Sequence, residues 1–294
     1  EQKDRSKKSG KIEKGDWEVL LEDDKEEFIG YTYLETDVKI TRYRKVKTKD
    51  GEQFQLVFNL TPFYPEGGGQ VGDTGVIESQ TETISIVDTK KENKLIVHFT
   101  DELPKNVTAS FVAKVNAADR KASERNHTAT HLLQESLRTV LGEHVVQKGS
   151  LVNPNYLRFD FTHFSKIEKA DLQKIEADVN AKILANINLN EHIDLPLAKA
   201  DDMGAIMLFG EKYDDVVRMI QFDSSKELCG GTHVNATGEI GLFKILSEGS
   251  TSSGIRRIEA TTGICAFAHL NNKEELLNEI AGIVKNKDLK MGVE

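Results

Sequence analysis

The chain lacks the features that mark several large classes of protein. Its 294 residues include only two cysteines, Cys229 and Cys265, so no disulfide framework is implied and a reducing compartment, the cytoplasm, is expected. No apolar run approaches the roughly 18 residues of a membrane helix, and the charged N-terminal residues lack the apolar core of a signal peptide. We therefore expect neither a membrane nor a disulfide partner.

Positive charge is also in short supply. Lysine and arginine number 39 against 48 aspartates and glutamates, which gives a formal net charge of −9. This sign does not suit a protein that binds nucleic acid through its overall charge, so such a ligand would need a local basic face or help from other domains. The 38% apolar and 30% charged residues are those of an ordinary folded protein, long enough for two modest domains.

The hydrophobic pattern predicts an α+β fold. A charged lead-in, residues 1–15, precedes a β-rich domain at 16–117, whose short strands and Asp50-Gly51 hairpin signal suggest a barrel-like sheet. Residues 118–265 read as an α+β domain with a mixed or antiparallel sheet and packed helices. Residues 266–294 read as a helical connection to a missing C-terminal domain, because the chain, which does not begin with Met, is interpreted as part of a longer polypeptide.

Two helices and three strands are expected in the second domain. The first helix starts near Asp119 and stops at Gly142, and the second opens with Ser165 and Glu168, which have the spacing of a capping box. The strands are expected at 216–222, 240–246 and 255–261. The apolar stripe of the first helix consists of Ala129, Leu132, Leu133, Leu137, Val140 and Leu141.

Four residues have the chemistry of metal ligands. His127 and His131 are four residues apart on the first helix, so both rings share a face about 150° from the centre of the apolar stripe. Cys229 and His233 flank Gly230-Gly231-Thr232, where glycine lets a thiolate and an imidazole converge. Nitrogen and sulfur donors of this kind suit zinc.

The number of zinc ligands stays open at this point. Four protein ligands are typical of a structural site, whereas a catalytic zinc keeps one position for water or substrate, so one histidine could remain uncoordinated. An unrelated exposed histidine pair and a structural cysteine are the alternative explanation.

A second notable segment, Thr61–Gln70, has three consecutive glycines; we call it the glycine loop. Gly67, Gly68 and Gly69 expose backbone N–H groups and permit close approach of a ligand. The segment lacks the trailing Lys-Ser/Thr of a phosphate loop, so binding of a nucleoside triphosphate is not indicated. A surface turn without a ligand is the alternative.

Taken together, these motifs resemble the editing domain of alanyl-tRNA synthetases. The resemblance covers about residues 15 to 265, and the amino-acid-activating, ATP-binding domain of that family, which lies upstream, is missing. It rests on these segments, in this order: Thr61–Tyr64 and Gly67–Asp73, Arg125–Leu133, Val146–Ser150, Leu157–Phe161, Cys229–His233 and Gly254–Ala260.

The resemblance implies hydrolysis of mischarged tRNA(Ala), which carries serine or glycine, and one zinc ion at His127, His131, Cys229 and His233. It also implies that Gln147 lies near the substrate, and that Gly67, Gly68 and Gly69 with Thr74 help to admit seryl groups. We expect catalytic roles for Gln147, Cys229 and His131. Lys148, Arg256 and Arg257 are candidates for contacts with the phosphates of the tRNA 3′ acceptor end.

Other functions remain open at the level of sequence. A free-standing alanyl-tRNA deacylase would share these motifs, and a threonyl-type editing domain would share the metal pattern but not the glycine loop. Two further alternatives are a tRNA-binding module with a purely structural zinc and a metal-dependent hydrolase of small esters. Deacylation of seryl-tRNA by the isolated chain would distinguish an editing enzyme from the binding module. Other domains of the parent synthetase are expected partners.

Overall fold

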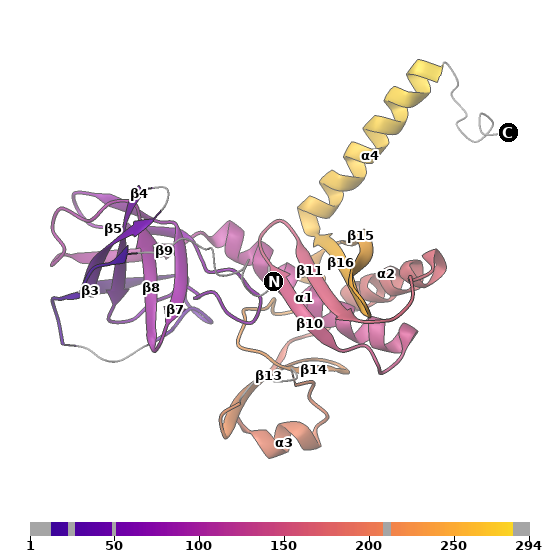
Figure 1. Cartoon of the computed structure of the whole chain (residues 1–294), viewed down its shortest axis with the longest axis horizontal. Helices are drawn as coiled ribbons and strands as arrows, with labels where there is room; N and C mark the ends of the chain where they lie inside the picture. Colours follow the sequence, from indigo (N-terminus) through magenta and orange to yellow (C-terminus); the bar gives the residue numbers. More distant parts are fainter. Residues whose placement is uncertain (1–12, 23–26, 49–50, 208–212, 285–294) are drawn as a thin grey trace. The chain divides into compact units, whose positions relative to one another are not determined.

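The computed structural model describes residues 13–22, 27–48, 51–207 and 213–284 (Figure 1). The chain divides into two compact units. Unit 1 comprises Glu1–Lys121 with Gly230–Thr232, and unit 2 comprises Ala122–Cys229 with His233–Glu294. Most of the predicted lead-in segment and the end of the predicted C-terminal connection lie outside the described residues.

Unit 1 is built from strands, in keeping with its β-branched and alternating sequence. They are β1 (Glu13–Lys14), β2 (Glu18–Val19), β3 (Glu35–Thr48), β4 (Gly51–Phe58), β5 (Gly75–Glu78), β6 (Thr83–Ile86), β7 (Asp88–Glu92), β8 (Leu95–Thr100) and β9 (Ser110–Val115).

One antiparallel sheet contains all of these strands, and β3 organises it. The first part of β3 pairs with β9, and the part after the register shift between Ile40 and Arg42 pairs with β4. The strand order is β6-β5-β9-β3-β4-β8-β7, with β1 and β2 also paired to β3. This order has two ends among the described strands, so closure into a barrel is not confirmed. The predicted hairpin is confirmed by the pairing of Thr48 with Gly51, although Asp50 lies outside the described residues.

The core of unit 1 follows from strand alternation, because every second side chain of a strand points to the same face. Ile84 and Ile86 on β6 and Phe111, Ala113 and Val115 on β9 are buried, while their sequence neighbours are exposed or half-buried. The glycine loop between β4 and β5 adds Phe63 to the same core.

Unit 2 has helices and shorter strands. They are α1 (Ala117–Leu141, which starts in unit 1), β10 (Gln147–Val152), β11 (Leu157–Thr162), α2 (Lys169–Leu184), β12 (Asn190–Pro196), α3 (Leu197–Asp202), β13 (Val216–Phe222), β14 (Ser225–Leu228), the 3₁₀ turn η2 (Thr237–Ile240), β15 (Phe243–Ser252), β16 (Ile255–Thr262) and α4 (Gly263–Val284).

Two antiparallel sheets order these strands as β10-β11-β16-β15 and β12-β13-β14. The apolar stripe of α1 packs with α2 and the four-stranded sheet into one core. An α+β fold with antiparallel sheets is therefore confirmed. Figure 1 shows α4 running on from the end of β16. Among the described residues, no helix combines the length and the apolar character needed to cross a membrane.

The predicted start of the second helix is wrong. Helix α2 begins at Lys169, and its N-cap residue Glu168 makes no side-chain capping bond. The Ser165 hydroxyl contacts a ring nitrogen of His163 instead, 3.2 Å away. Burial of Ile175 and Val179, rather than a capping box, stabilises this helix against the core.

Candidate metal centre

Helix α1 brings two imidazoles of the predicted metal cluster together. His127 and His131, four residues apart, have ring centroids separated by 5.3 Å, and their exposed fractions are 4% and 3%. The face opposite the apolar stripe is thus also covered. His233 lies over both rings, with centroid distances of 4.5 Å to each.

The other two members of the cluster come from the segment after β14. Cys229 and His233 belong to unit 2, whereas Gly230–Thr232 between them belong to unit 1. Thr232 is held there by Gln70, whose side-chain amide donates to Thr232 Oγ1 over 2.9 Å and accepts the Thr232 N–H over 3.1 Å. The two cluster residues therefore flank a segment with its own fixed partners.

The donor atoms of the cluster lie close enough together to surround one metal ion. One ligand atom from each of His127, His131, Cys229 and His233 lies within 4.8 Å of the others. Cys229 Sγ is 3.5 Å from His127 Nε2 and 3.4 Å from His233 Nε2. Bonds of about 2.0–2.3 Å at tetrahedral angles place donor atoms roughly 3.3–3.6 Å apart. The two distances from Cys229 Sγ therefore fit a zinc-sized ion, and the donor types suit it.

Neighbouring groups orient the His233 ring. Thr128 Oγ1 lies 3.1 Å from His233 Nδ1 and also accepts the N–H of Val234 over 3.2 Å. The Thr128 hydroxyl oxygen can accept two hydrogen bonds, so it can also accept the Nδ1–H of His233 in the tautomer whose Nε2 is free to bind a metal ion. In that tautomer the lone pair of His233 Nε2, which lies 3.4 Å from Cys229 Sγ, is available to the ion.

His131 is flanked by buried polar atoms without partners. Its Nδ1 and the Oε1 of Glu227 are buried and have no hydrogen-bond partner among the described residues. His131 Nε2 and Glu227 Oε2 lie 3.6 Å apart. Burial raises the pKa of Glu227 to about 8. Unpartnered buried groups are costly, and a cation held by the imidazole would relieve that cost.

The cluster histidines are held in the form that binds metals. Burial lowers the pKa of His127 to about 3. Burial, followed by the charges of the neighbouring histidines, also lowers the pKa of His131 and of His233 well below the ordinary value. Neutral imidazole is the ligating form, so the rings need not lose a proton at neutral pH before they bind an ion.

The remaining predicted residues of unit 2 lie on the four-stranded sheet. Gln147 is half-buried at the start of β10, opposite Phe161 of β11, and Lys148 beside it is exposed. Arg256 on β16 donates to Glu248 Oε1 over 2.6 Å, and Arg257 donates twice to the Asp160 carboxylate, over 2.6 and 2.8 Å. A phosphate would have to compete with these carboxylates for both guanidinium groups.

The glycine loop and Thr74 belong to unit 1. Gly67 and Gln70 exchange two backbone hydrogen bonds of 3.1 and 2.9 Å, and Gly68, with φ of 57°, adopts the left-handed conformation between them. The carbonyl of Thr74, which is half-buried, accepts the Asn116 N–H over 2.8 Å. The loop is thus a defined turn.

The groups that support the cluster were not predicted from the sequence. Thr128 lies inside the histidine motif, but its partner His233 is distant in sequence. Glu227 had a usable signal, since residues two apart along a strand share a face, and Glu227 precedes Cys229 by two. The bonds between Gln70 and Thr232 join residues 162 apart and leave no local pattern.

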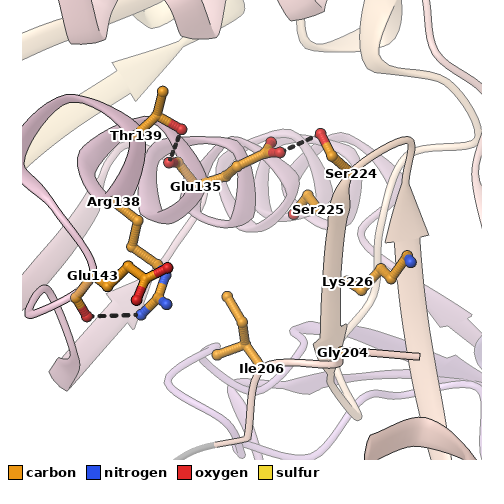
Figure 2. Close-up of a pocket in the computed structure, with 9 residues that line it drawn as sticks. All are labelled: Glu135, Arg138, Thr139, Glu143, Gly204, Ile206, Ser224, Ser225 and Lys226. Carbon is orange, nitrogen blue, oxygen red and sulfur yellow. Dashed lines mark hydrogen bonds between the residues drawn. The ribbon is translucent and has the colours of Figure 1, made fainter. Parts of the chain in front are cut away.

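A cavity of about 340 Å³ in unit 2 begins one helical turn beyond His131 (Figure 2). Three of its charged side chains, those of Glu135, Arg138 and Lys226, have partners within the unit. Glu135 accepts from Ser224 and pairs with Lys182 at 2.9 Å, and Arg138 donates to the Glu143 carbonyl over 3.3 Å. Lys226 donates to the Met203 carbonyl over 3.1 Å. The cavity therefore offers these charges to a ligand only in competition with existing partners.

Comparisons with known proteins match both units. The family model described as tRNA synthetases class II (A) matches residues 1–121. The model described as threonyl and alanyl tRNA synthetase second additional domain matches residues 217–259, which include Cys229 and His233.

Three curated relatives match nearly the entire chain. Alanine–tRNA ligase of Flavobacterium psychrophilum is 54% identical over 97% of this chain and 33% of that protein. The same comparison gives 50% identity over 100% and 34% for the ligase of Cytophaga hutchinsonii. For that of Christiangramia forsetii it gives 53% over 98% and 33%. The chain spans about a third of the length of these curated relatives.

Proposed function

Because the chain belongs to the alanyl-tRNA synthetase family, of whose curated members it spans about a third, we propose that it hydrolyses mischarged tRNA(Ala). The substrates are tRNA(Ala) carrying serine or glycine, and the reaction uses one zinc ion at His127, His131, Cys229 and His233. The observation that carries this proposal is the convergence of these four donors within 4.8 Å in unit 2.

An enzyme pocket that selects alanine for attachment to tRNA cannot exclude the smaller glycine by size. It also rejects serine poorly, because one added hydroxyl costs little binding energy. A second, hydrolytic site must accept both and spare alanine, which lies between them in size. Polar contacts are then needed. We assign them to Thr74, Gln147 and the backbone of Gly67, Gly68 and Gly69, whose N–H groups can approach a ligand closely.

When bound, a zinc ion supplies a Lewis acid that polarises or orients the ester. The chain's own residues would position the attacking water and the ion. Gln147 offers an amide that can orient an attacking water, and Cys229 and His131 hold the ion in place. Thr128 would orient the His233 ring so that its other nitrogen faces the ion, and Glu227 lies beside the His131 ring.

We propose that the 3′ acceptor end of the tRNA enters the hydrolytic site and that Lys148 contacts its phosphate backbone. Arg256 and Arg257 remain candidates, although each has an internal carboxylate partner. With a net charge of −9, the chain gains little from its overall charge, so the other domains of the synthetase are expected to contribute affinity.

One observation favours a second candidate function. Four protein donors close a tetrahedron, and closed sites are typical of structural zinc. A tRNA-binding module with a structural ion is therefore the alternative.

The two cysteines provide a matched test. Hydrolysis of seryl-tRNA(Ala) is measured for the wild type, Cys229→Ala and Cys265→Ala, with zinc content and circular dichroism recorded alongside. We expect Cys229→Ala to lose at least 100-fold in rate, since one ligand is gone, and Cys265→Ala, altered on α4, to match the wild type. Full activity in folded Cys229→Ala would contradict the proposal. A zinc-bound wild type without hydrolysis would favour the binding module.

A further inference from the structure

Unit 1 contains a cavity whose aromatic wall the proposed function does not use, although Gly67 and Gly68 of the glycine loop also line it. It has a volume of about 420 Å³, within the range of sites for small ligands. None of the metal-cluster residues lines it. Its lining is Phe28, Tyr31, Tyr64, Pro65, Glu66, Gly67, Gly68, Lys91, Ile96 and Gly230.

Backbone pairing brings the three aromatic rings together. Phe28 forms a parallel bridge with Thr61, and the Ile29 N–H donates to the Thr61 carbonyl over 2.9 Å. Gly30 sits so close to Pro62 that a Cβ there would lie 2.1 Å from the Pro62 carbonyl oxygen. This turn therefore requires glycine at position 30, and it packs the segment that carries Phe28 and Tyr31 against the start of the glycine loop at Pro62.

A buried arginine also holds the Gly30 turn and the start of the glycine loop together. Arg120, 1% exposed, donates to the carbonyls of Gly30 and Pro62 over 2.5 and 2.9 Å and pairs with Asp73. Asp73 Oδ2 in turn accepts the Tyr64 N–H over 2.7 Å. The cavity wall is thus preorganised, which lowers the entropy that a ligand loses on binding.

One of the three aromatic rings is partly exposed. Phe28 makes edge-to-face contacts with Tyr31 and Tyr64, at centroid distances of 4.8 and 6.0 Å. Tyr64 is 5% exposed and donates to the Gly67 carbonyl over 3.0 Å. Tyr31 is 46% exposed, although its hydroxyl donates to the Gly230 carbonyl over 2.7 Å. Its ring is therefore held at one edge while much of its surface faces solvent.

The polar groups around the rings suit a nucleotide. Lys91, exposed on β7, adds a cation, and the backbone of Gly67 and Gly68 adds polar groups without side chains in the way. An aromatic platform beside a cation is how proteins bind unpaired bases of single-stranded nucleic acid. The Glu66 carboxylate at the same wall lies 3.4 Å from Lys90, which offsets its charge.

We propose that this cavity is a subsite for an unpaired nucleobase at the 3′ end of an RNA strand. Tyr31 supplies the stacking face, and Lys91 faces the adjoining phosphate. The identity of the RNA as a tRNA and the position of the base at its 3′ end rest on the proposed function, whereas base recognition rests on the cavity alone.

The test uses a single-stranded RNA that ends in CCA, carries a 5′ fluorophore and has no amino acid. Its binding to the full chain is followed by fluorescence anisotropy, beside an otherwise identical RNA whose 3′ nucleotide is abasic. We expect Tyr31→Ala to bind the complete RNA roughly tenfold more weakly, because a base–aromatic stack is lost. Tyr31→Phe, which keeps the ring, should stay close to the wild type.

Tyr33→Ala is the matched control, since Tyr33 is 59% exposed two residues away and does not line the cavity. It should bind like the wild type. The abasic RNA should bind the wild type as weakly as the complete RNA binds Tyr31→Ala, with no further loss when both changes are combined. Equal effects of Tyr31→Ala and Tyr33→Ala, or full affinity for the abasic RNA, would overturn the proposal.

A second measurement covers weak binding. Titration with millimolar adenosine 5′-monophosphate should shift the NMR signals of the Tyr31, Gly67 and Gly68 amides in the wild type and not in Tyr31→Ala. Unmoved amides would contradict the subsite. Base-dependent binding without seryl-tRNA hydrolysis would leave the subsite standing and refute the proposed function, and hydrolysis without base dependence would do the reverse.

Discussion

At the scale of single residues, the proposed metal site depends on side chains that bind no metal themselves. Thr128 Oγ1 meets His233 Nδ1 at 3.1 Å, and Glu227 lies 3.6 Å from His131 Nε2. A hydrogen-bonded partner such as Thr128 selects the tautomer and angle of its ring and raises the basicity of that ring as a ligand. Affinity for the ion is therefore expected to respond to changes outside the four donors.

Replacing Thr128 by valine tests this expectation. Valine keeps the shape of threonine and removes the acceptor, so His233 loses the bond that orients its ring. We expect zinc affinity, measured by competition with a chromophoric chelator, to fall about 10- to 100-fold.

Thr130→Val is the control for this substitution. Thr130 is buried on the same helix, but its hydroxyl donates to the Asn126 carbonyl over 2.8 Å. It should retain the affinity of the wild type. If Thr128→Val also retained it, the orienting role of Thr128 would be refuted.

At the scale of elements, strand β8 carries a buried histidine that ties the stability of unit 1 to pH. His98 is 0% exposed, stacks on Phe58 at 4.1 Å, and has ring nitrogens 2.8 Å from Thr61 Oγ1 and 3.2 Å from the Leu56 carbonyl. Burial lowers its pKa from 6.5 to about 3. The folded state therefore holds this ring neutral where the unfolded state would protonate it.

The sign of the pH effect follows. Because the folded pKa is depressed, the contribution of His98 is fully present above pH 6.5 and is lost as the pH falls from 6.5 toward 3. We expect the unfolding free energy of unit 1 to drop by about 2 kcal/mol between pH 6.5 and 5 from this group alone. Urea unfolding, read by the fluorescence of Trp17, measures it. His98→Gln should flatten this part of the profile, and an unchanged pH slope in that variant would refute the assignment.

Hydrophobic periodicity predicted most of the elements with long regular patterns. The strand expected at 216–222 is β13, Val216–Phe222, and the helix expected between Asp119 and Gly142 is α1, Ala117–Leu141. Local signals were less reliable at element ends. Ser165 had the spacing of a cap, yet its hydroxyl bonds His163, because a short polar side chain takes the partner that tertiary packing brings near.

Some residues of the candidate site could likewise be predicted from local sequence and others could not. The histidine spacing on α1 and the Cys-Gly-Gly-Thr-His segment mark the four donors, because metal ligation restricts residue type and local spacing. Glu227 and the Gln70–Thr232 bonds depend on which distant segments meet, and no local pattern encodes that. The burial of His127 was missed for the same reason, since His233 covers the helix face that the apolar stripe leaves polar.

At the scale of the whole molecule, all four donors belong to unit 2 although they come from two distant stretches of the chain. An ion bound by them would join α1 to the segment after β14. Any ligand that binds only the folded state stabilises that state by mass action.

Metal removal should therefore destabilise unit 2. At a free zinc concentration about 100 times its Kd, the bound ion is worth about 3 kcal/mol, so chelation should lower the calorimetric melting temperature of this unit by several degrees. Cys265→Ala should show the same shift as the wild type, and Cys229→Ala should show a much smaller one. A melting temperature indifferent to chelator in zinc-loaded wild type would contradict a folded-state metal site.

The most direct test of the account is single-turnover hydrolysis of seryl-, glycyl- and alanyl-tRNA(Ala) by this chain, before and after zinc is removed and restored. We predict hydrolysis of the first two and sparing of the third, with activity lost on chelation and regained with zinc. Equal hydrolysis of all three, or activity that persists in zinc-free protein, would contradict it.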